Sequence, residues 1–388
     1  MNWLERLNPT VTSLRPSGIR AITQEARAIP GCVFLTIGEP DGNMPEPVKD
    51  AIARSLQENA THYPPNAGED ALRQRIAEHL TRRHRPVTAD QVVITNGSTE
   101  AIACALFALV APGDEVIMPV PCFGLYDTLI RLAGGVVREL HTENDGFQIT
   151  SEALRACVNE RTKAVIFASP NNPTGLIYNA ESLSCLKKLA LERDVFLLAD
   201  SVYDELVYVP AMPHVMDDPD IADRVILLQS FSKPYAMTGV RIGYAVAPAP
   251  IAPQLIKVHA ALTVGTPTFI QRGCEDIFST DLAPMRALYR ARRDLVCAHL
   301  REMALPFAEP TGAFYVFADI RAFGMDSETF VRRLMREEKL ALIPSSCFGV
   351  EGFVRLSYCY SDAELETGLV RLKRFVKKLR PSDAAGAR

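Results

Sequence analysis

Two hydrophobic patterns alternate along the first three quarters of the chain. Short apolar runs rich in β-branched residues are typical of buried strands, and stretches with apolar residues every three or four positions are typical of helices. The runs predict strands at Val92–Thr95, Glu115–Val120, Ala164–Ala168, Val195–Ala199, Val225–Gln229 and Ile242–Ala247. The periodic stretches predict helices at Pro47–Asn59, Ala67–Arg83, Ser98–Ala111, Ser151–Val158 and Ala180–Arg193. This order favours βαβ units, and therefore an α/β fold whose mostly parallel sheet binds ligands at the carboxyl ends of its strands.

The last quarter has a different pattern. A long periodic stretch, Leu282–Met303, predicts a helix that connects two lobes. Beyond it the pattern predicts a smaller α+β lobe with strands at Ala313–Asp319, Leu340–Ile343 and Phe353–Tyr358 and helices at Ser327–Glu338 and Ala363–Leu379.

The domain division follows from this change of pattern. We expect a large domain at 46–281 and a small C-terminal domain at 282–380. Residues 1–45 hold no complete unit of their own, so we expect an arm that packs with the small domain. Residues 381–388 are small and polar, which predicts a disordered tail.

Composition excludes several classes of protein. Of 388 residues, 48% are hydrophobic and 23% charged, as in ordinary globular chains rather than disordered or fibrous ones. The net charge is −4, which gives no basic surface for nucleic acid or an acidic membrane. We therefore expect a small-molecule partner.

Cysteines and the N-terminus indicate the compartment. Nine cysteines are scattered without a C-x-x-C pair, which predicts reduced thiols and neither a disulfide framework nor a metal site. The N-terminus lacks an apolar signal core, and the run 101–111 is too short to cross a bilayer. We expect a cytoplasmic protein without a membrane segment.

The turn after the first predicted strand has the form of a phosphate cradle. Asn96, Gly97, Ser98 and Thr99 lie between the strand and an apolar helix. A small-residue turn that opens a helix exposes backbone N–H groups and the positive end of the helix dipole. An ordinary Ser/Thr helix cap would have the same sequence, so this turn alone does not decide.

Two further polar groups follow predicted strands. Ser169–Gly175 reads Ser-Pro-Asn-Asn-Pro-Thr-Gly, a turn in which two prolines hold two asparagines rigidly. Asp200 ends the next strand, with Tyr203 three residues later. A carboxylate beside a buried strand needs a partner, which could be a helix N-terminus, a basic side chain or a protonated ring nitrogen.

The fourth group is Ser230-Phe231-Ser232-Lys233, with Arg241 between two nearby glycines. Lysine is rarely placed directly after a buried strand, and a buried lysine has a lowered pKa and attacks carbonyl groups. Arg241 beside glycines can approach an anion closely. A solvated loop lysine is the alternative interpretation.

Together these groups resemble the fold-type-I pyridoxal-phosphate enzymes, specifically the class I/II aminotransferases of the aspartate aminotransferase superfamily. Ser-Pro-Asn-Asn-Pro-Thr-Gly and Ser-x-Ser-Lys followed by Arg241 carry the resemblance, which extends from Gly38-Glu39-Pro40-Asp41 to Phe353–Ser357. It implies a large domain with a mostly parallel sheet between helices, plus a smaller α+β domain. It also implies pyridoxal 5'-phosphate as the cofactor and transfer of an amino group between an L-amino acid and a 2-oxo acid in a ping-pong mechanism.

The resemblance assigns roles around the cofactor ring. Lys233 matches the lysine that forms the internal aldimine and then carries the proton from the substrate Cα. Asp200 matches the carboxylate that pairs with the pyridine N–H. Tyr203 and Asn172 match the groups that hydrogen-bond the phenolic oxygen, and Phe123 matches the aromatic side chain that stacks on the ring.

It also assigns the phosphate and substrate shells. The phosphate shell would consist of Ser98, Thr99, Ser230, Ser232 and Arg241. Arg355 matches the arginine that binds the substrate α-carboxylate, with Gly38 and Asn172 beside it. Tyr63 matches a tyrosine that reaches the phosphate of the neighbouring subunit, which implies a homodimer.

Two loops depart from the family pattern. Met44 and its neighbours follow Gly-Glu-Pro-Asp where an aromatic residue and a Pro-Thr-Pro run are usual, and Ser345 follows Pro344 where glycine is usual. Both loops border the substrate side chain in the family, so the amino donor stays open.

Two other functions share these motifs. A pyridoxal-phosphate lyase, synthase or oxidase would use the same Lys233, Asp200 and Arg355. A non-catalytic cofactor-binding regulator would not need an intact Lys233 and Arg355. Transamination is the function that the sequence favours.

Overall fold

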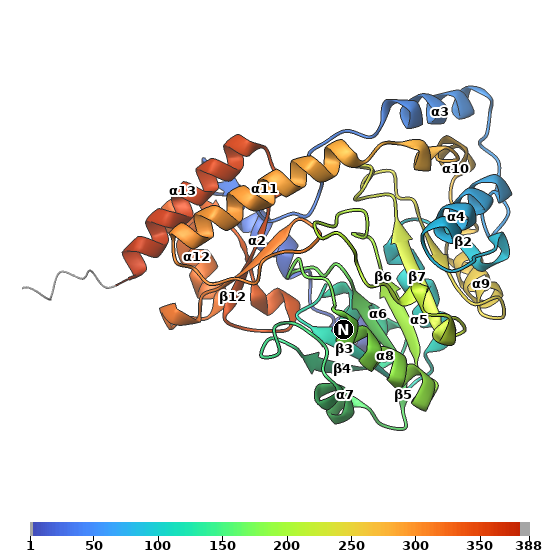
Figure 1. Ribbon diagram of the computed structural model, residues 1–388, viewed down its shortest axis with the longest axis horizontal. Coiled ribbons are helices and arrows are strands. Elements are labelled where there is room, and N and C mark those ends of the chain that lie inside the picture. The colour runs from blue at the N-terminus through green and yellow to red at the C-terminus, as the bar shows by residue number, and fades with distance from the viewer. Residues whose placement is uncertain (1–2, 381–388) are drawn as a thin grey trace, which may run out of the picture.

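The computed structural model describes residues 3–380, and the predicted disordered tail at 381–388 lies outside the described residues. A seven-stranded sheet forms the framework of the larger part (Figure 1), in the order β2-β8-β7-β6-β5-β3-β4. Its strands are β2 (Val92–Thr95), β3 (Glu115–Val120), β4 (Val136–His141), β5 (Thr162–Ala168), β6 (Phe196–Asp200), β7 (Val225–Ser230) and β8 (Gly243–Val246). All neighbours pair in parallel except β8, which is antiparallel to β2 and β7. The carboxyl ends of the other six strands therefore meet at one edge, where β8 begins.

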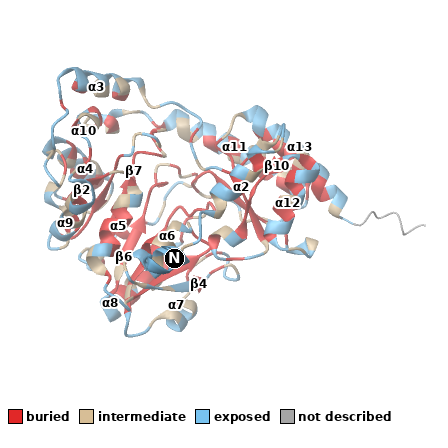
Figure 2. Ribbon diagram, turned by 180° about the vertical axis from the view of Figure 1, so that it is seen from behind, coloured by how far each residue is buried: buried red, intermediate tan, exposed pale blue. Residues whose placement is uncertain are grey.

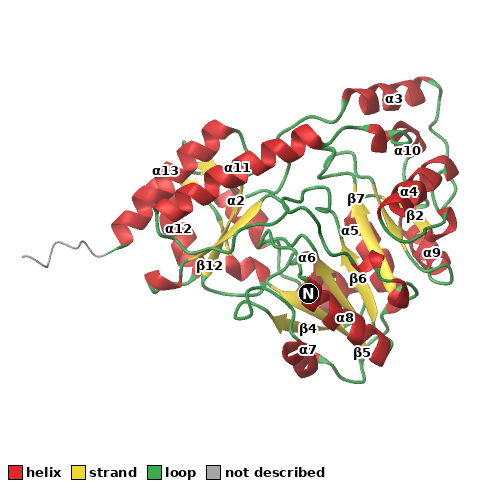
Figure 3. Ribbon diagram, viewed as in Figure 1, coloured by secondary structure: helices red, strands yellow, loops and turns green. Residues whose placement is uncertain are grey.

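Helices cover both faces of this sheet (Figure 3). They are α4 (Asp70–Arg83), α5 (Ser98–Leu109), α6 (Leu125–Leu132), α7 (Ser151–Cys157), α8 (Ala180–Arg193) and α9 (Ala252–Thr263). Helices α3 (Glu46–Gln57) and α10 (Thr268–Gly273) pack against each other beyond the sheet (Figure 3). Alternate strand residues enter two separate cores: Ile166 packs with α5 and α6, while Val165 and Phe167 pack with α4 and α8. Burial on both faces explains the nearly continuous apolar runs in the sequence (Figure 2).

The smaller part contains an antiparallel sheet in the order β11-β12-β9, reached through the long helix α11 (Ala283–Glu302). Figure 1 shows α11 running beside α13 and away from the large sheet. The other elements are β9 (Tyr315–Asp319), α12 (Ser327–Glu338), β10 (Leu340–Ala341), β11 (Ile343–Pro344), β12 (Phe353–Ser357) and α13 (Asp362–Leu379).

The N-terminal segment joins this smaller part through a strand pair. It contains α1 (Pro9–Ser13), α2 (Gly18–Arg27) and β1 (Val33–Phe34), and β1 pairs in parallel with β10. Val33 lies opposite Leu340 in the register.

The structure corrects the predicted elements in places. Helix α4 begins at Asp70 and not at Ala67, because Gly68 has φ +102° and a Cβ there would come 2.3 Å from Ile94. The strand predicted at Leu340–Ile343 is two strands, β10 and β11, which pair with different partners. The sequence patterns missed seven helices and strands: α1, α2, β1, β4, α6, α9 and α10. Among the described residues, no helix combines the length and apolar character that a membrane span requires.

Candidate cofactor and substrate site

The turn between β2 and α5 opens a helix at Ser98, so the first N–H groups of that helix have no acceptor within it. Gly97 has φ +82°, and α5 starts at Ser98 with no side chain capping it. Arg241 lies directly against this turn, since its Nη2 donates to the Asn96 carbonyl at 3.3 Å. A Cβ on Gly97 would come 2.5 Å from the same Nη2. Glycine is therefore required for the guanidinium to approach the free N–H groups of Ser98 and Thr99.

The end of β7 comes to the same place. Gly243, the first residue of β8, lies opposite both Thr95 and Ser230. A Cβ on Gly243 would come 2.9 Å from the Ser98 nitrogen, so glycine lets these chain segments approach closely. Ser230 Oγ lies 2.8 Å from Ser232 Oγ, and both side chains are buried. Hydroxyl, amide and guanidinium donors thus gather at one point, which is the donor set that a phosphate group requires.

Lys233 follows this cluster and is half-buried. Its Nζ donates to the Gly38 carbonyl at 2.6 Å. Burial lowers the pKa of Lys233, which favours the neutral amine that can act as a nucleophile. Its amine has a partner within the chain, which a freely solvated loop lysine would lack.

Asp200 is buried at the end of β6. Its Oδ2 accepts a hydrogen bond from Tyr126 Oη at 2.6 Å, and its Oδ1 lies 3.4 Å from the Val202 nitrogen. Burial raises the pKa of Asp200 to about 6, despite these donors. No cationic side chain is bonded to it among the described residues, so a protonated ring nitrogen would supply the missing positive partner.

Aromatic side chains surround Asp200. Phe123 is half-buried and meets Tyr126 edge-on at 5.9 Å between ring centroids. Tyr203 is buried, and its hydroxyl lies 2.8 Å from that of Tyr315 on β9. These contacts join the carboxyl edge of the large sheet to the small sheet.

Arg355 lies on β12 and is 1% exposed, so the alternative of an exposed arginine is wrong. Its Nη1 donates to Asn172 Oδ1 at 2.8 Å, and its Nη2 donates to the Thr36 carbonyl. The guanidinium lies over the Tyr315 ring, 4.5 Å from the centroid. Its Nε has no hydrogen-bond partner, and no acidic side chain pairs with it among the described residues. A carboxylate from outside the chain fits this buried, incompletely satisfied charge.

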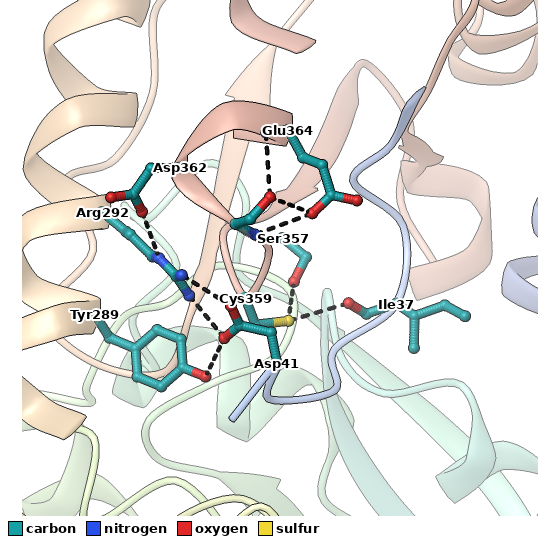
Figure 4. Close-up of polar contacts among 9 residues, drawn as sticks. Ile37, Asp41, Tyr289, Arg292, Ser357, Cys359, Asp362 and Glu364 are labelled. Carbon is teal, nitrogen blue, oxygen red and sulfur yellow. Dashed lines mark hydrogen bonds and ion pairs between the residues drawn. The ribbon is translucent and has the colours of Figure 1, made fainter. Parts of the chain in front are cut away.

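The segment 36–41 forms the wall between Lys233 and Arg355. Gly38 packs against Tyr315 so tightly that a Cβ there would overlap the tyrosine hydroxyl. Figure 4 shows how Asp41, at the end of the segment, is held by Arg292 of α11. Both Asp41 oxygens accept from Arg292 at 2.8 Å, while Arg292 Nε donates to Asp362 at 3.0 Å. Arg292 also lowers the pKa of Asp41.

Within a single chain, Tyr63 does not contact the cofactor and substrate residues described above. Its side chain is 86% exposed and has no hydrogen-bond partner among the described residues. Sequence reasoning missed Tyr126, Tyr315 and Thr36. Tyr126 could have been found, because it follows Phe123 by three residues in an apolar stretch that forms α6. Thr36 acts through its carbonyl, which carries no sequence signal.

Comparison with known proteins agrees with this geometry. The model of the family "Aminotransferase class I and II" matches residues 30–372. The chain belongs to this family. It is 37% identical to an aspartate aminotransferase of Thermotoga maritima, over 89% of this chain and 91% of that protein. It is 33% identical to aromatic-amino-acid aminotransferase 2 of Thermococcus litoralis, over 96% of this chain and 98% of that protein.

A solved structure gives the same result for the fold. The aspartate aminotransferase from Thermus thermophilus, solved with maleate, superposes with a TM-score of 0.90 at 34% identity, covering 95% of this chain and 99% of that one. The predicted fold type I and the predicted enzyme class are therefore confirmed, and the chain is an aminotransferase. Such an enzyme acts on amino acids and 2-oxo acids.

Proposed function

We propose that this aminotransferase holds pyridoxal 5'-phosphate at the carboxyl edge of its large sheet, with Lys233 as the attachment residue. The observation that carries the proposal is the amine of Lys233 at 2.6 Å from the Gly38 carbonyl, with a pKa lowered by burial. Its neighbours fit the cofactor because phosphate donors lie on one side and an unpaired buried carboxylate on the other. When bound, the cofactor supplies an electron-accepting ring that stabilises negative charge at the substrate Cα.

The phosphate would lie against the 96–99 turn. The backbone N–H groups of Ser98 and Thr99 and the guanidinium of Arg241 donate to its oxygens, together with the hydroxyls of Ser230 and Ser232. Gly97 and Gly243 are the positions at which a side chain would block this approach.

The ring would lie between Phe123 and the sheet edge. Asp200 would accept a hydrogen bond from the pyridine N–H and is itself oriented by Tyr126. Tyr203 and Asn172 would donate to the phenolic oxygen. Asn172 has its Nδ2 for this bond because Arg355 uses its Oδ1. We assign catalysis to Lys233, Asp200 and Tyr203.

Lys233 moves the proton. Its neutral amine would take the proton from the substrate Cα as a general base and, within the same half-reaction, would pass it as a general acid to the cofactor carbon C4′. Arg355 orients the substrate for this transfer by binding the α-carboxylate, while Gly38 lines the pocket.

A half-reaction tests the proposal. Purified enzyme is mixed with one amino acid at a time, without an acceptor, and the products are identified by absorbance and mass spectrometry. We expect one equivalent of pyridoxamine phosphate and one of the matching 2-oxo acid per site. Release of ammonia, or uptake of oxygen, would instead favour the lyase, synthase or oxidase reading, and no reaction with any amino acid would contradict the proposal. The same screen identifies the amino donor.

Tyr63 supports a homodimer as part of the proposal. A tyrosine that is 86% exposed in a single chain fits a side chain that completes the phosphate site of a second copy. Sedimentation of the active enzyme at assay concentration should give twice the mass of 42.7 kDa. An active monomer would contradict this part.

Two further predictions belong with the proposal. We divide the chain into an arm at 1–45, a large domain at 46–281 and a small domain at 282–380, and limited proteolysis should cut near these boundaries first. We also keep the prediction of a cytoplasmic location, which cell fractionation tests.

A further inference from the structure

A polar cluster lies behind the phosphate turn, with one residue buried, one half-buried and one exposed, and the proposed function does not use it. It consists of Glu100 on α5 with His259 and Thr263 on α9. His259 is 0% exposed, and its Nδ1 lies 3.1 Å from Glu100 Oε1. Thr263 Oγ1 donates to the same oxygen at 3.1 Å. An acid and an imidazole are seldom buried together without a reason, because each must be desolvated.

Glu100 connects this cluster to the turn. Its Oε2 accepts from the backbone nitrogen of Asn96 at 2.5 Å and from Asn96 Nδ2 at 3.0 Å. Asn96 Nδ2 also lies 3.3 Å from Thr263 Oγ1. The Asn96 carbonyl in turn accepts from Arg241. Glu100 thus fixes the peptide group before Asn96, and Arg241 contacts the one after it, directly before the N–H groups of Ser98 and Thr99.

The charge of Glu100 makes its position unexpected. A carboxylate in the first turn of α5 would repel a phosphate bound at the same helix end. Burial alone would raise the pKa of Glu100, but His259 and the donors of Asn96 hold it below its ordinary value, so the acid stays ionised. The hydrogen bonds that Asn96 and Thr263 donate also stabilise this charge.

We propose that Glu100 and His259 are positioning residues that hold the 96–98 turn in the shape that receives the cofactor phosphate. This inference rests on the proposed function. The ligand atoms of Glu100, Cys104 and His259 lie within 4.8 Å of one another, which also invites a metal interpretation. Both oxygens of Glu100 already accept hydrogen bonds, Oε2 from Asn96 and Oε1 from Thr263, while His259 Nδ1 lies close to Oε1 without a hydrogen bond, and we therefore assign the cluster to holding Glu100 in place.

The test compares two forms of the cofactor that differ only in the phosphate. The full-length protein, freed of cofactor, is titrated with pyridoxal 5'-phosphate and with pyridoxal, and binding is followed by absorbance. Glu100→Ala and His259→Leu should weaken binding of the phosphate form by about 10-fold or more, since a hydrogen bond to a charged group contributes about 1.5–3 kcal/mol. Binding of pyridoxal should change by less than about 2-fold.

Two further variants separate positioning from folding. His259→Asn keeps an N–H near the place of Nδ1 and should restore most of the phosphate-dependent affinity. Cys104→Ala removes a buried side chain one turn along α5 without touching the turn, and should leave the ratio of the two affinities unchanged. Thermal unfolding of each variant monitors folding separately.

The outcomes are distinct. If Glu100→Ala bound pyridoxal 5'-phosphate more tightly than the wild type, the carboxylate would act only by repelling the phosphate, and the inference would be overturned. Equal losses for both cofactor forms, or the same ratio change in Cys104→Ala, would assign the effect to packing and also overturn it. A wild-type protein that binds neither form would contradict the proposed function itself.

Discussion

Two regions of this aminotransferase, here called the cofactor floor and the substrate wall, are held together by different kinds of contact. The floor consists of strand ends: Asp200 closes β6, Ser230 closes β7, and the 96–99 turn follows β2. The wall consists of segment 36–41 and β12, which are joined by contacts such as Arg355 to the Thr36 carbonyl across 319 residues of sequence. The floor is fixed by the register of one sheet, whereas the wall depends on how two sheets and the N-terminal segment pack together.

Substitutions in the floor should reduce activity more than substitutions in the wall. Asp200→Asn keeps the size of the side chain but removes the charge that would hold the pyridine nitrogen protonated. We expect the rate constant of the half-reaction to fall by about 10³-fold, as when another preorganised electrostatic group is removed. Single-turnover absorbance measures this. A loss below about 10-fold would mean that Asp200 has no electronic role.

The same substitution should stabilise the protein without cofactor. Burial raises the pKa of Asp200 from 3.8 to about 6, so the unfolded state ionises more readily than the folded one. The stability of the wild type should fall as pH rises from about 4 to about 6 and stay lower above it, by about 3 kcal/mol. At pH 8, Asp200→Asn should recover much of this loss in the free energy of unfolding. Below about pH 4 it should leave the free energy of unfolding unchanged. Urea unfolding at both pH values checks it, with exposed Asp145→Asn as the control.

Substitution of Arg355 tests the role of the substrate wall. Arg355→Lys replaces a bidentate donor by a point charge, so the Michaelis constant for amino acids should rise about 10–100-fold. The factor should be similar for every amino acid. Amines without a carboxylate should lose much less, and cofactor affinity should stay nearly unchanged because Arg241 serves the phosphate. Equal losses for amines and amino acids would show that Arg355 is structural.

Asp41 gives the smallest expected effect. Asp41→Asn weakens the contact with Arg292 that anchors segment 36–41, so the Michaelis constant should rise about 3–10-fold while cofactor affinity is unchanged. Asp362→Asn is the matched control, since Asp362 contacts the same Arg292 but its side chain is 72% exposed. In steady-state kinetics the Michaelis constant should rise more for Asp41→Asn than for Asp362→Asn. The reverse order would mean that Arg292 acts mainly through its contact with Asp362 on α13.

The same contrast explains what the sequence could predict. Lys233, Asp200 and the 96–99 turn each follow a strand whose apolar run is visible, so the parallel sheet alone predicts that they meet. The wall was less predictable. The Arg355–Asn172 contact spans 183 residues, and Gly38 and Thr36 act through their carbonyls. The resemblance to the family supplied Gly38 and Arg355, but the anchoring by Arg292 and the Tyr126–Asp200 contact came only from the structure.

The most direct test of the account is to locate the cofactor on the chain. The purified enzyme, reduced with borohydride and digested, is mapped by mass spectrometry, with Lys233→Ala as the control. The account predicts a yellow protein whose reduced phosphopyridoxyl group lies on Lys233, and a Lys233→Ala variant that carries none. The group on another lysine, or on none in the wild type, would contradict it.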